Sequence, residues 1–131
     1  MEPVHVLSIT PIYVAILGLL FLPMTARVAL YRIKTGISLG PGDDPEMLRR
    51  MRGQANFIET VPMAVFLLIV MEILGASNTW LHALGLTFVL GRIASYLGVV
   101  QIAPLAFRVA GSAAALLTIL TGSIWIATNV L

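Results

Sequence analysis

The segment VLSITPIYVAILGLLFLPMTA, residues 6–26, contains no charged side chain and is rich in Leu and Ile. A second uncharged segment, VAGSAAALLTILTGSIWIATNVL, ends the sequence at residues 109–131. The hydrocarbon core of a bilayer rejects charge, and about 20 mostly apolar residues cross it as a helix. Both segments therefore predict transmembrane helices.

The composition points to the same environment for the whole chain. Hydrophobic residues make up 59% of the 131 residues and charged residues only 11%, against roughly 25% charged in a typical soluble domain. With a mean hydropathy of +0.98, the chain has too few polar side chains to cover a soluble globule. The length allows one domain, residues 1–131. The lack of cysteine excludes a disulfide framework, a protein thiolate nucleophile and cysteine-ligated metal.

Two further apolar runs, Thr60–Met71 and Ile73–Gly91, lie between these segments. The runs are interrupted by Glu72, Gly75, Ser77 and Asn78, which predict a tight turn joining two helices. A second turn is expected near Gly98–Pro104, because proline suits the first turn of a new helix. We therefore predict an all-α, integral membrane four-helix bundle, with helices near 6–33, 47–75, 79–98 and 104–130 and one substantial loop at 35–46.

The basic residues indicate the orientation of the bundle. Six of the eight Lys and Arg residues lie within residues 27–52, and the other two are Arg92 and Arg108. Because basic loops stay on the cytoplasmic side, the 35–46 loop and the third loop are predicted to be cytoplasmic and both termini outside. Met1-Glu2-Pro3 contains no basic residue, so the first span is expected to be retained rather than cleaved as a signal. The compact loops favour a prokaryotic inner membrane.

Charged and amide side chains recur along one face of the second predicted helix. At about 100° per residue, Arg52, Asn56 and Glu59 fall within roughly 60° of one another, and Arg49 extends the same stripe. Arg92 on the third helix sits about 9 Å inside its cytoplasmic end at 1.5 Å per residue, a depth close to that of Glu59. Because an unpaired charge is expensive inside a membrane, we predict a buried Arg92–Glu59 pair.

These residues predict a polar pocket near the cytoplasmic headgroups. Cationic walls there favour an anionic, water-soluble ligand, and the surrounding lipid-level surface favours an apolar one. Two plainer interpretations stay open: arginines that only set topology or contact lipid phosphate, and a purely structural Arg–Glu pair. No His, Asp and Glu residues cluster at metal-ligand spacing, so no metal is expected. The few basic residues mark one side of the membrane, so no nucleic acid is expected as a partner.

A motif in the second helix resembles a known family signature. The run Arg52-Gly53-Gln54-Ala55-Asn56-Phe57-Ile58-Glu59, followed by Pro62, is similar to the R-x-x-x-N-x-x-E pattern of the MAPEG superfamily, the membrane-associated proteins in eicosanoid and glutathione metabolism. Gly91-Arg92 with Tyr96, and Arg108 at the start of the fourth helix, also resemble this family. The resemblance covers nearly the whole chain.

The resemblance implies a homotrimer that binds glutathione as a cosubstrate between neighbouring subunits on the cytoplasmic side. It implies a glutathione transferase that joins the glutathione thiolate to an apolar electrophile from the lipid bilayer, with glutathione peroxidase activity on lipid hydroperoxides as a second reaction. By position, Arg108 is the catalytic residue that stabilises the thiolate. The glutathione-binding residues implied by the resemblance are Arg27, Arg52, Gln54, Asn56, Glu59, Arg92 and Tyr96.

Two positions depart from the relatives. Thr60 stands where some relatives have Tyr, and Ser95 stands where relatives often have His or Tyr. These departures keep an alternative open, a non-catalytic family member that binds an anionic lipid or metabolite. A small multidrug transporter of similar length fits poorly, because such carriers need a carboxylate in the first helix and Val6–Ala26 has none.

Overall fold

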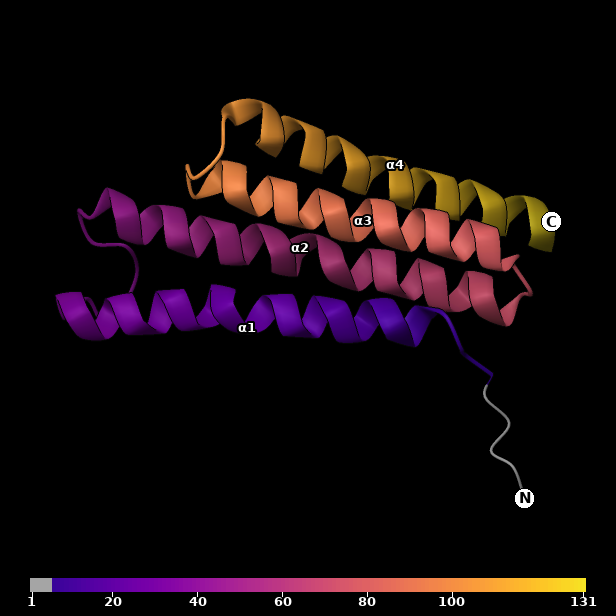
Figure 1. The fold of residues 1–131 in the computed structure, drawn as a ribbon, viewed down its shortest axis with the longest axis horizontal. Helices are drawn as coiled ribbons and strands as arrows, with labels where there is room; N and C mark the ends of the chain where they lie inside the picture. The colour runs from indigo at the N-terminus through magenta and orange to yellow at the C-terminus, as the bar shows by residue number, and fades with distance from the viewer. Residues whose placement is uncertain (1–5) are drawn as a thin grey trace, which may run out of the picture.

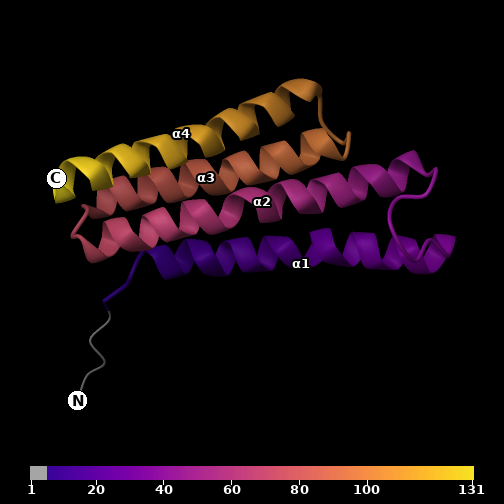
Figure 2. The same cartoon turned by 180° about the vertical axis from the view of Figure 1, so that it is seen from behind.

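A computed structural model describes residues 6–131 and arranges them as four α-helices. The helices are α1 (Thr10–Thr35), α2 (Pro45–Ile73), α3 (Asn78–Val99) and α4 (Leu105–Val130). They lie side by side in chain order along the long axis of the molecule (Figure 1), and the view from behind shows the same order (Figure 2). Each helix is long and apolar enough to cross a membrane, which confirms the all-α, four-span prediction. Met1-Glu2-Pro3 lie outside the described residues.

The start of α1 differs from the prediction, because the helix begins at Thr10 rather than at residue 6. Pro11 is the physical reason. A proline is tolerated in the first helical turn, but deeper in a helix its ring clashes with the carbonyl four residues back. Ile9 at the N-cap offers no side-chain acceptor, and Glu72 of α2 supplies one instead. Its carboxylate accepts hydrogen bonds from the backbone N–H groups of Ser8, Ile9 and Thr10 at 2.6, 2.8 and 2.7 Å.

The next two helices begin at caps supplied by the residue just before each helix. Asp44 Oδ1 accepts from the backbone N–H groups of Glu46 and Met47 at 2.9 and 3.0 Å, which starts α2. Ser77 Oγ accepts from the backbone N–H of Trp80 at 3.4 Å, which starts α3. Both helices therefore begin slightly before their predicted starts, because a side-chain acceptor is already available there.

Glycines let α3 and α4 pack closely. A Cβ on Gly98 would lie 2.5 Å from the backbone nitrogen of Arg108, and one on Gly91 would lie 2.7 Å from Cβ of Ala114. A Cβ on Gly111 would overlap the backbone oxygen of Gly91. Small residues at these positions bring the backbones of the two helices together. Arg108 is thereby held beside the last turns of α3.

The hydrophobic core lies where α1, α2 and α3 meet. Leu17, Leu68 and Phe88 are almost fully buried in it. Many large apolar side chains on the outside, such as Phe66 and Leu116, remain exposed, as expected of helices that face lipid. One end of the bundle carries both the α1–α2 loop and the α3–α4 turn (Figure 1), and the opposite end carries the α2–α3 turn and the C-terminus.

Candidate functional site

A polar cavity opens at the end of the bundle that carries the α1–α2 loop. Its volume is about 200 Å³. α2 lines one side of it, and the end of α3, the following turn and the first turn of α4 line the other. The lining residues are Leu48, Arg49, Arg52, Asn56, Val99, Gln101 and Arg108. Three guanidinium groups and two amides face a space that no carboxylate lines, so the cavity suits an anion.

The first turns of α2 place three of these side chains on one face. Arg49 is held by Glu46, whose Oε2 accepts from Arg49 Nη2 at 3.0 Å. Arg52 Nη1 lies 3.7 Å from Glu59 Oε1, and these two side chains are 55% and 57% exposed. The helical period predicted this stripe from the sequence. Glu59 lies beside Arg52 in an exposed, weakly held pair, where its carboxylate stays accessible.

Arg92 lies behind the cavity and is 1% exposed. Its Nη1 donates to Asn56 Oδ1 and to Thr60 Oγ1, both at 2.9 Å. Its Nη2 donates to the backbone oxygen of Gly111 in α4 at 2.8 Å. Among residues 6–131, no carboxylate forms an ion pair with this guanidinium.

The predicted buried Arg92–Glu59 pair is therefore wrong. Neutral oxygens from α2 and α4 already satisfy most of the Arg92 donors. Burying the Glu59 carboxylate as well would add the desolvation cost of a second ion. Glu59 instead stays exposed beside Arg52.

Ser95 and Thr60 complete the buried network around Arg92. Ser95 is fully buried, and its Oγ donates to Asn56 Oδ1 at 3.0 Å. Thr60 Oγ1 donates to the backbone oxygen of Asn56 at 3.0 Å and accepts from Arg92. The sequence marked both positions only as departures from relatives. The hydrogen-bond partners of short hydroxyl side chains depend on how the helices pack, so the sequence alone does not predict them.

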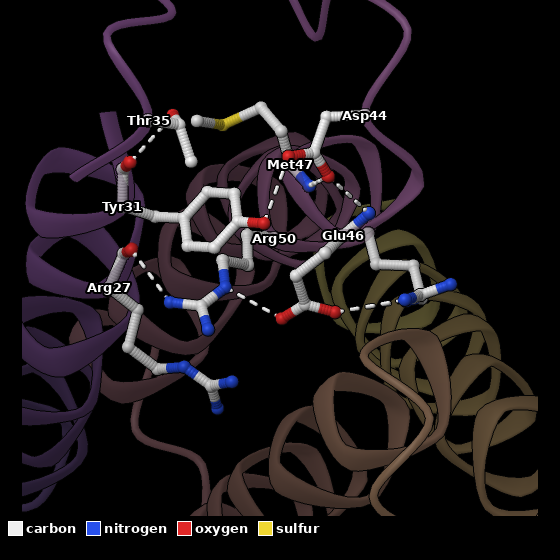
Figure 3. Close-up of polar contacts among 8 residues, drawn as sticks. Arg27, Tyr31, Thr35, Asp44, Glu46, Met47 and Arg50 are labelled. Carbon is white, nitrogen blue, oxygen red and sulfur yellow. Dashed lines mark hydrogen bonds and ion pairs between the residues drawn. The ribbon is translucent and has the colours of Figure 1, made fainter. Parts of the chain in front are cut away.

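Besides Glu59 and Arg92, three more predicted site residues do not line the cavity of their own chain. Gln54 Nε2 donates to Thr25 Oγ1 of α1 at 3.0 Å, on the side of α2 away from the cavity. The Tyr96 ring packs against Gly53, where an added Cβ would lie 2.8 Å from it, and its buried hydroxyl has no hydrogen-bond partner among the described residues. Arg27 lies on α1, and its backbone oxygen accepts from Arg50 Nη1 at 3.1 Å (Figure 3).

A second polar cluster joins α1 to the start of α2 (Figure 3). Tyr31 Oη donates to Asp44 Oδ2 at 2.9 Å, and Arg50 Nε donates to Glu46 Oε1 at 2.7 Å. The Arg50 guanidinium also lies 4.4 Å from the centre of the Tyr31 ring. The backbone N–H of Met47, followed by the Tyr31 hydroxyl, lowers the pKa of Asp44 below its usual range. Because these groups satisfy one another, the cluster fastens the two helices together.

Gln101 is a cavity residue that the sequence did not suggest. It lies in the α3–α4 turn with a φ of 61°, in the left-handed region that a residue other than glycine seldom adopts. Its side chain lines the cavity together with Arg108. A glutamine in a predicted turn gives no warning of this conformation, so only the packed turn reveals it.

An apolar groove of about 430 Å³ runs between α1 and α2 on the other side of α2. It extends from Val14 and Phe21 of α1 to Phe57 and Phe66 of α2. Its lining is almost entirely apolar and lies at the depth of the spanning segments. Among residues 6–131, no group of three His, Asp and Glu residues is placed to hold a metal ion.

Comparison with known proteins agrees with this architecture. The model of the MAPEG family matches residues 10–128, a range that reaches from the first helix to the last. An inner membrane protein, YecN, of Escherichia coli strain K12 is 27% identical over 90 residues, which are 69% of either chain. The protein of the same name from Escherichia coli O6:H1, strain CFT073, matches to the same extent. With four membrane-length helices and a family match along nearly its whole length, the chain belongs to the MAPEG family of multi-pass membrane proteins.

Proposed function

We propose that this protein is a membrane-bound glutathione transferase. The observation that carries the proposal is the cavity formed by Arg49, Arg52, Arg108 and Asn56 at one end of the bundle. The MAPEG family includes glutathione transferases. A cavity rich in cations, at the edge of the membrane, suits a water-soluble anion that reacts with a lipid-dissolved partner.

The groups of glutathione match the groups at the cavity. Glutathione carries two carboxylates, an ammonium and a thiol at neutral pH. Arg49 and Arg52 suit the carboxylates, and the exposed carboxylate of Glu59 beside Arg52 suits the ammonium. Arg108 then remains for the sulfur, and one nearby guanidinium lowers the pKa of an acid by about 1–3 units. The protein needs no cysteine because the cosubstrate brings the sulfur.

The second substrate in this proposal comes from the bilayer. The groove between α1 and α2 is apolar and opens at membrane depth, which suits an apolar electrophile. A lipid hydroperoxide is the substrate class for the proposed peroxidase reaction of the same thiolate. The names of the two relatives place those proteins in an inner membrane. We propose a bacterial inner membrane here as well, with the α1–α2 loop and the α3–α4 turn on the cytoplasmic side.

We further propose that the working unit is a homotrimer. The cavity of one chain holds about 200 Å³, which is less than the roughly 300 Å³ of a small ligand pocket. Gln54 contacts Thr25 of α1, on the opposite side of α2 from the cavity. A neighbouring copy that presents its Gln54 and Arg27 to this cavity supplies the missing wall.

Calorimetric titration of the detergent-solubilised protein with glutathione tests the proposal, together with turnover of an apolar electrophile such as a chlorodinitrobenzene. Binding with turnover is the expected result. Binding without turnover favours the non-catalytic alternative, a protein that holds an anionic lipid or metabolite. One observation favours that alternative: the Thr60 and Ser95 hydroxyls bond to buried partners rather than line the cavity. Absence of glutathione binding would refute the transferase.

A further inference from the structure

The side-chain amide of Asn56 joins the buried network to the polar cavity. Its Oδ1 accepts two hydrogen bonds, from Arg92 Nη1 at 2.9 Å and from Ser95 Oγ at 3.0 Å. Asn56 also lines the cavity with Arg49, Arg52 and Arg108. One side chain is therefore bonded on its inner side and faces the cavity on its other side.

The chemistry of Arg92 decides which amide atom lies on the inner side. The oxygen and nitrogen of an asparagine amide have nearly the same shape, so their assignment rests on the hydrogen bonds around them. A guanidinium only donates. The Asn56 atom that faces Arg92 is therefore the oxygen, and Ser95 must donate to the same atom.

Thr60 fixes the position of Arg92 itself. Its hydroxyl donates to the backbone oxygen of Asn56 at 3.0 Å, so a lone pair remains to accept from Arg92 Nη1 at 2.9 Å. Gly111 supplies the third acceptor, for Arg92 Nη2, at 2.8 Å. The guanidinium is thus bonded from α2 and from α4 at once, and it cannot turn away from Asn56 without breaking these bonds.

The Asn56 nitrogen has no such protein partner. Among the described residues, no oxygen accepts a hydrogen bond from Nδ2, and the half-buried side chain lines the cavity. With its oxygen held by two donors, the amide offers the cavity two N–H donors in a fixed direction. The polar part of the cavity wall then includes donors from three guanidinium groups and this amide.

We propose that Ser95, with Arg92 and Thr60, is a positioning residue that holds the Asn56 amide with its nitrogen toward the cavity, where it donates to an anionic oxygen of the ligand. This inference rests on the proposed function where the ligand is glutathione. The same hydrogen-bond donors of the cavity suit inorganic phosphate equally well. Ser95 and Thr60 touch no ligand in this arrangement and act through Asn56.

The sharpest variant is Asn56→Asp, which keeps the shape of the side chain. One carboxylate oxygen still accepts from Arg92, so the protein is expected to fold. The other oxygen replaces the nitrogen and faces the cavity, where it repels an anion. We expect the affinity of the solubilised protein for glutathione and for inorganic phosphate, measured by calorimetry, to fall at least about tenfold. Asn129→Asp makes the same change of charge at the opposite end of the bundle and should leave both affinities unchanged.

Ser95→Ala tests the positioning role separately. It removes one of the two hydrogen bonds that orient the Asn56 oxygen, so affinity should fall about three- to tenfold. The same substitution in an Asn56→Ala background should have no further effect, because Ser95 acts only through Asn56. A purely structural role for Ser95 would lower affinity equally in both backgrounds and would overturn the inference.

The two anions separate this inference from the proposed function. Glutathione binding that Asn56→Asp leaves unchanged overturns the inference and keeps the transferase. Phosphate binding that follows the expected variant pattern, without glutathione binding by the wild type, keeps the inference and refutes the transferase. Failure of the wild type to bind either anion overturns both.

Discussion

Arg92 and Arg108 are the same type of residue in opposite surroundings. Arg92 is 1% exposed and donates to three neutral oxygens. Arg108 is exposed and lines the cavity. Arg92 has three donors bonded inside the protein, and its unbonded Nε is buried away from the cavity, so this guanidinium has little to offer a new charge on a ligand. Of these two arginines, we therefore propose Arg108 as the one that stabilises the thiolate in the proposed reaction.

Arg108→Ala should slow conjugation while leaving glutathione affinity largely intact, because Arg49 and Arg52 still bind the carboxylates. An ordinary thiol with a pKa of about 8.5 is only about 3% thiolate at pH 7, so loss of a pKa depression of about 1–3 units lowers the thiolate fraction about eight- to thirtyfold. The more basic thiolate is also the better nucleophile, with a Brønsted slope of about 0.4–0.5, so the net loss of rate at neutral pH is at most about fourfold.

The pH dependence of this variant identifies the cause. Its rate should rise with pH and reach or pass that of the wild type at high pH, where the thiol ionises without help and the more basic thiolate is the better nucleophile. Lys34→Ala, at the exposed end of α1 and outside the cavity, is the matched control. A rate with Arg108→Ala that equals the wild type at neutral pH would remove Arg108 from catalysis.

The starts of α1 and α2 are held by acids from two different places in the chain. α2 begins at its own Asp44, whereas α1 depends on Glu72, which lies near the far end of α2. The two acids lie at opposite ends of the bundle. Together they fix α1 against α2, because Asp44 also accepts from Tyr31 of α1.

Glu72→Ala should loosen the first turn of α1. The carboxylate accepts from Ser8, Ile9 and Thr10, and hydrogen bonds to a charged group contribute about 1.5–3 kcal/mol each, with part of the loss recovered by water. We expect a loss of about 1–3 kcal/mol in the free energy of unfolding, and faster hydrogen exchange at the amides of residues 8–13. Asp43→Asn, a change of charge in the α1–α2 loop at the opposite end of the bundle, is the control. Unchanged exchange at residues 8–13 would contradict the capping role.

Asp44 should make the α1–α2 junction sensitive to acid. Its pKa in the folded protein lies below the ordinary 3.8, because Met47 N–H and the Tyr31 hydroxyl donate to the carboxylate. A lowered pKa means that the stabilisation is complete above the unfolded pKa and is lost as pH falls through the folded one. Asp44→Asn keeps a cap acceptor but does not titrate.

The pH series compares the thermal midpoints of wild type and Asp44→Asn in detergent. The wild type should be the more stable above about pH 5, and the difference should shrink as the pH falls below the ordinary 3.8. A difference that stays constant across this range would show that Asp44 does not titrate with folding.

At the scale of the whole molecule, the four spans could be predicted because hydrocarbon excludes charge and a helix has one length that crosses it. The stripe of Arg49, Arg52 and Asn56 could be predicted because helical period alone puts those residues on one face. The hydrogen-bond partners of Arg92 could not be predicted in this way. Periodicity gives the depth of a residue in the membrane, but the rotation of α3 depends on the close contact of Gly91 with Gly111. That contact turns Arg92 toward neutral oxygens and away from Glu59.

The proposed trimer predicts that two site variants complement each other when they are co-expressed, which a protein active as a single chain could not do. If one subunit supplies Arg108 and its neighbour supplies Arg27, then Arg27→Ala and Arg108→Ala should each lower activity when expressed alone. Every mixed trimer of the two variants contains one interface at which both arginines are intact. Random mixing at equal expression therefore leaves about a quarter of all sites fully intact, because three quarters of the trimers are mixed and each has one intact site of three. The mixture should thus be more active than the average of the two variants.

A matched pair of variants tests the geometry of this sharing. Arg52 and Arg108 line the same cavity of the same chain. Co-expression of Arg52→Ala with Arg108→Ala should therefore restore nothing, since every site keeps one of the two defects. Restoration by this pair, or none by the Arg27 pair, would contradict a site shared in this way. Native mass spectrometry of the co-expressed protein gives the number of subunits. It therefore distinguishes trimers in which activity is not restored from a protein that is active as a single chain.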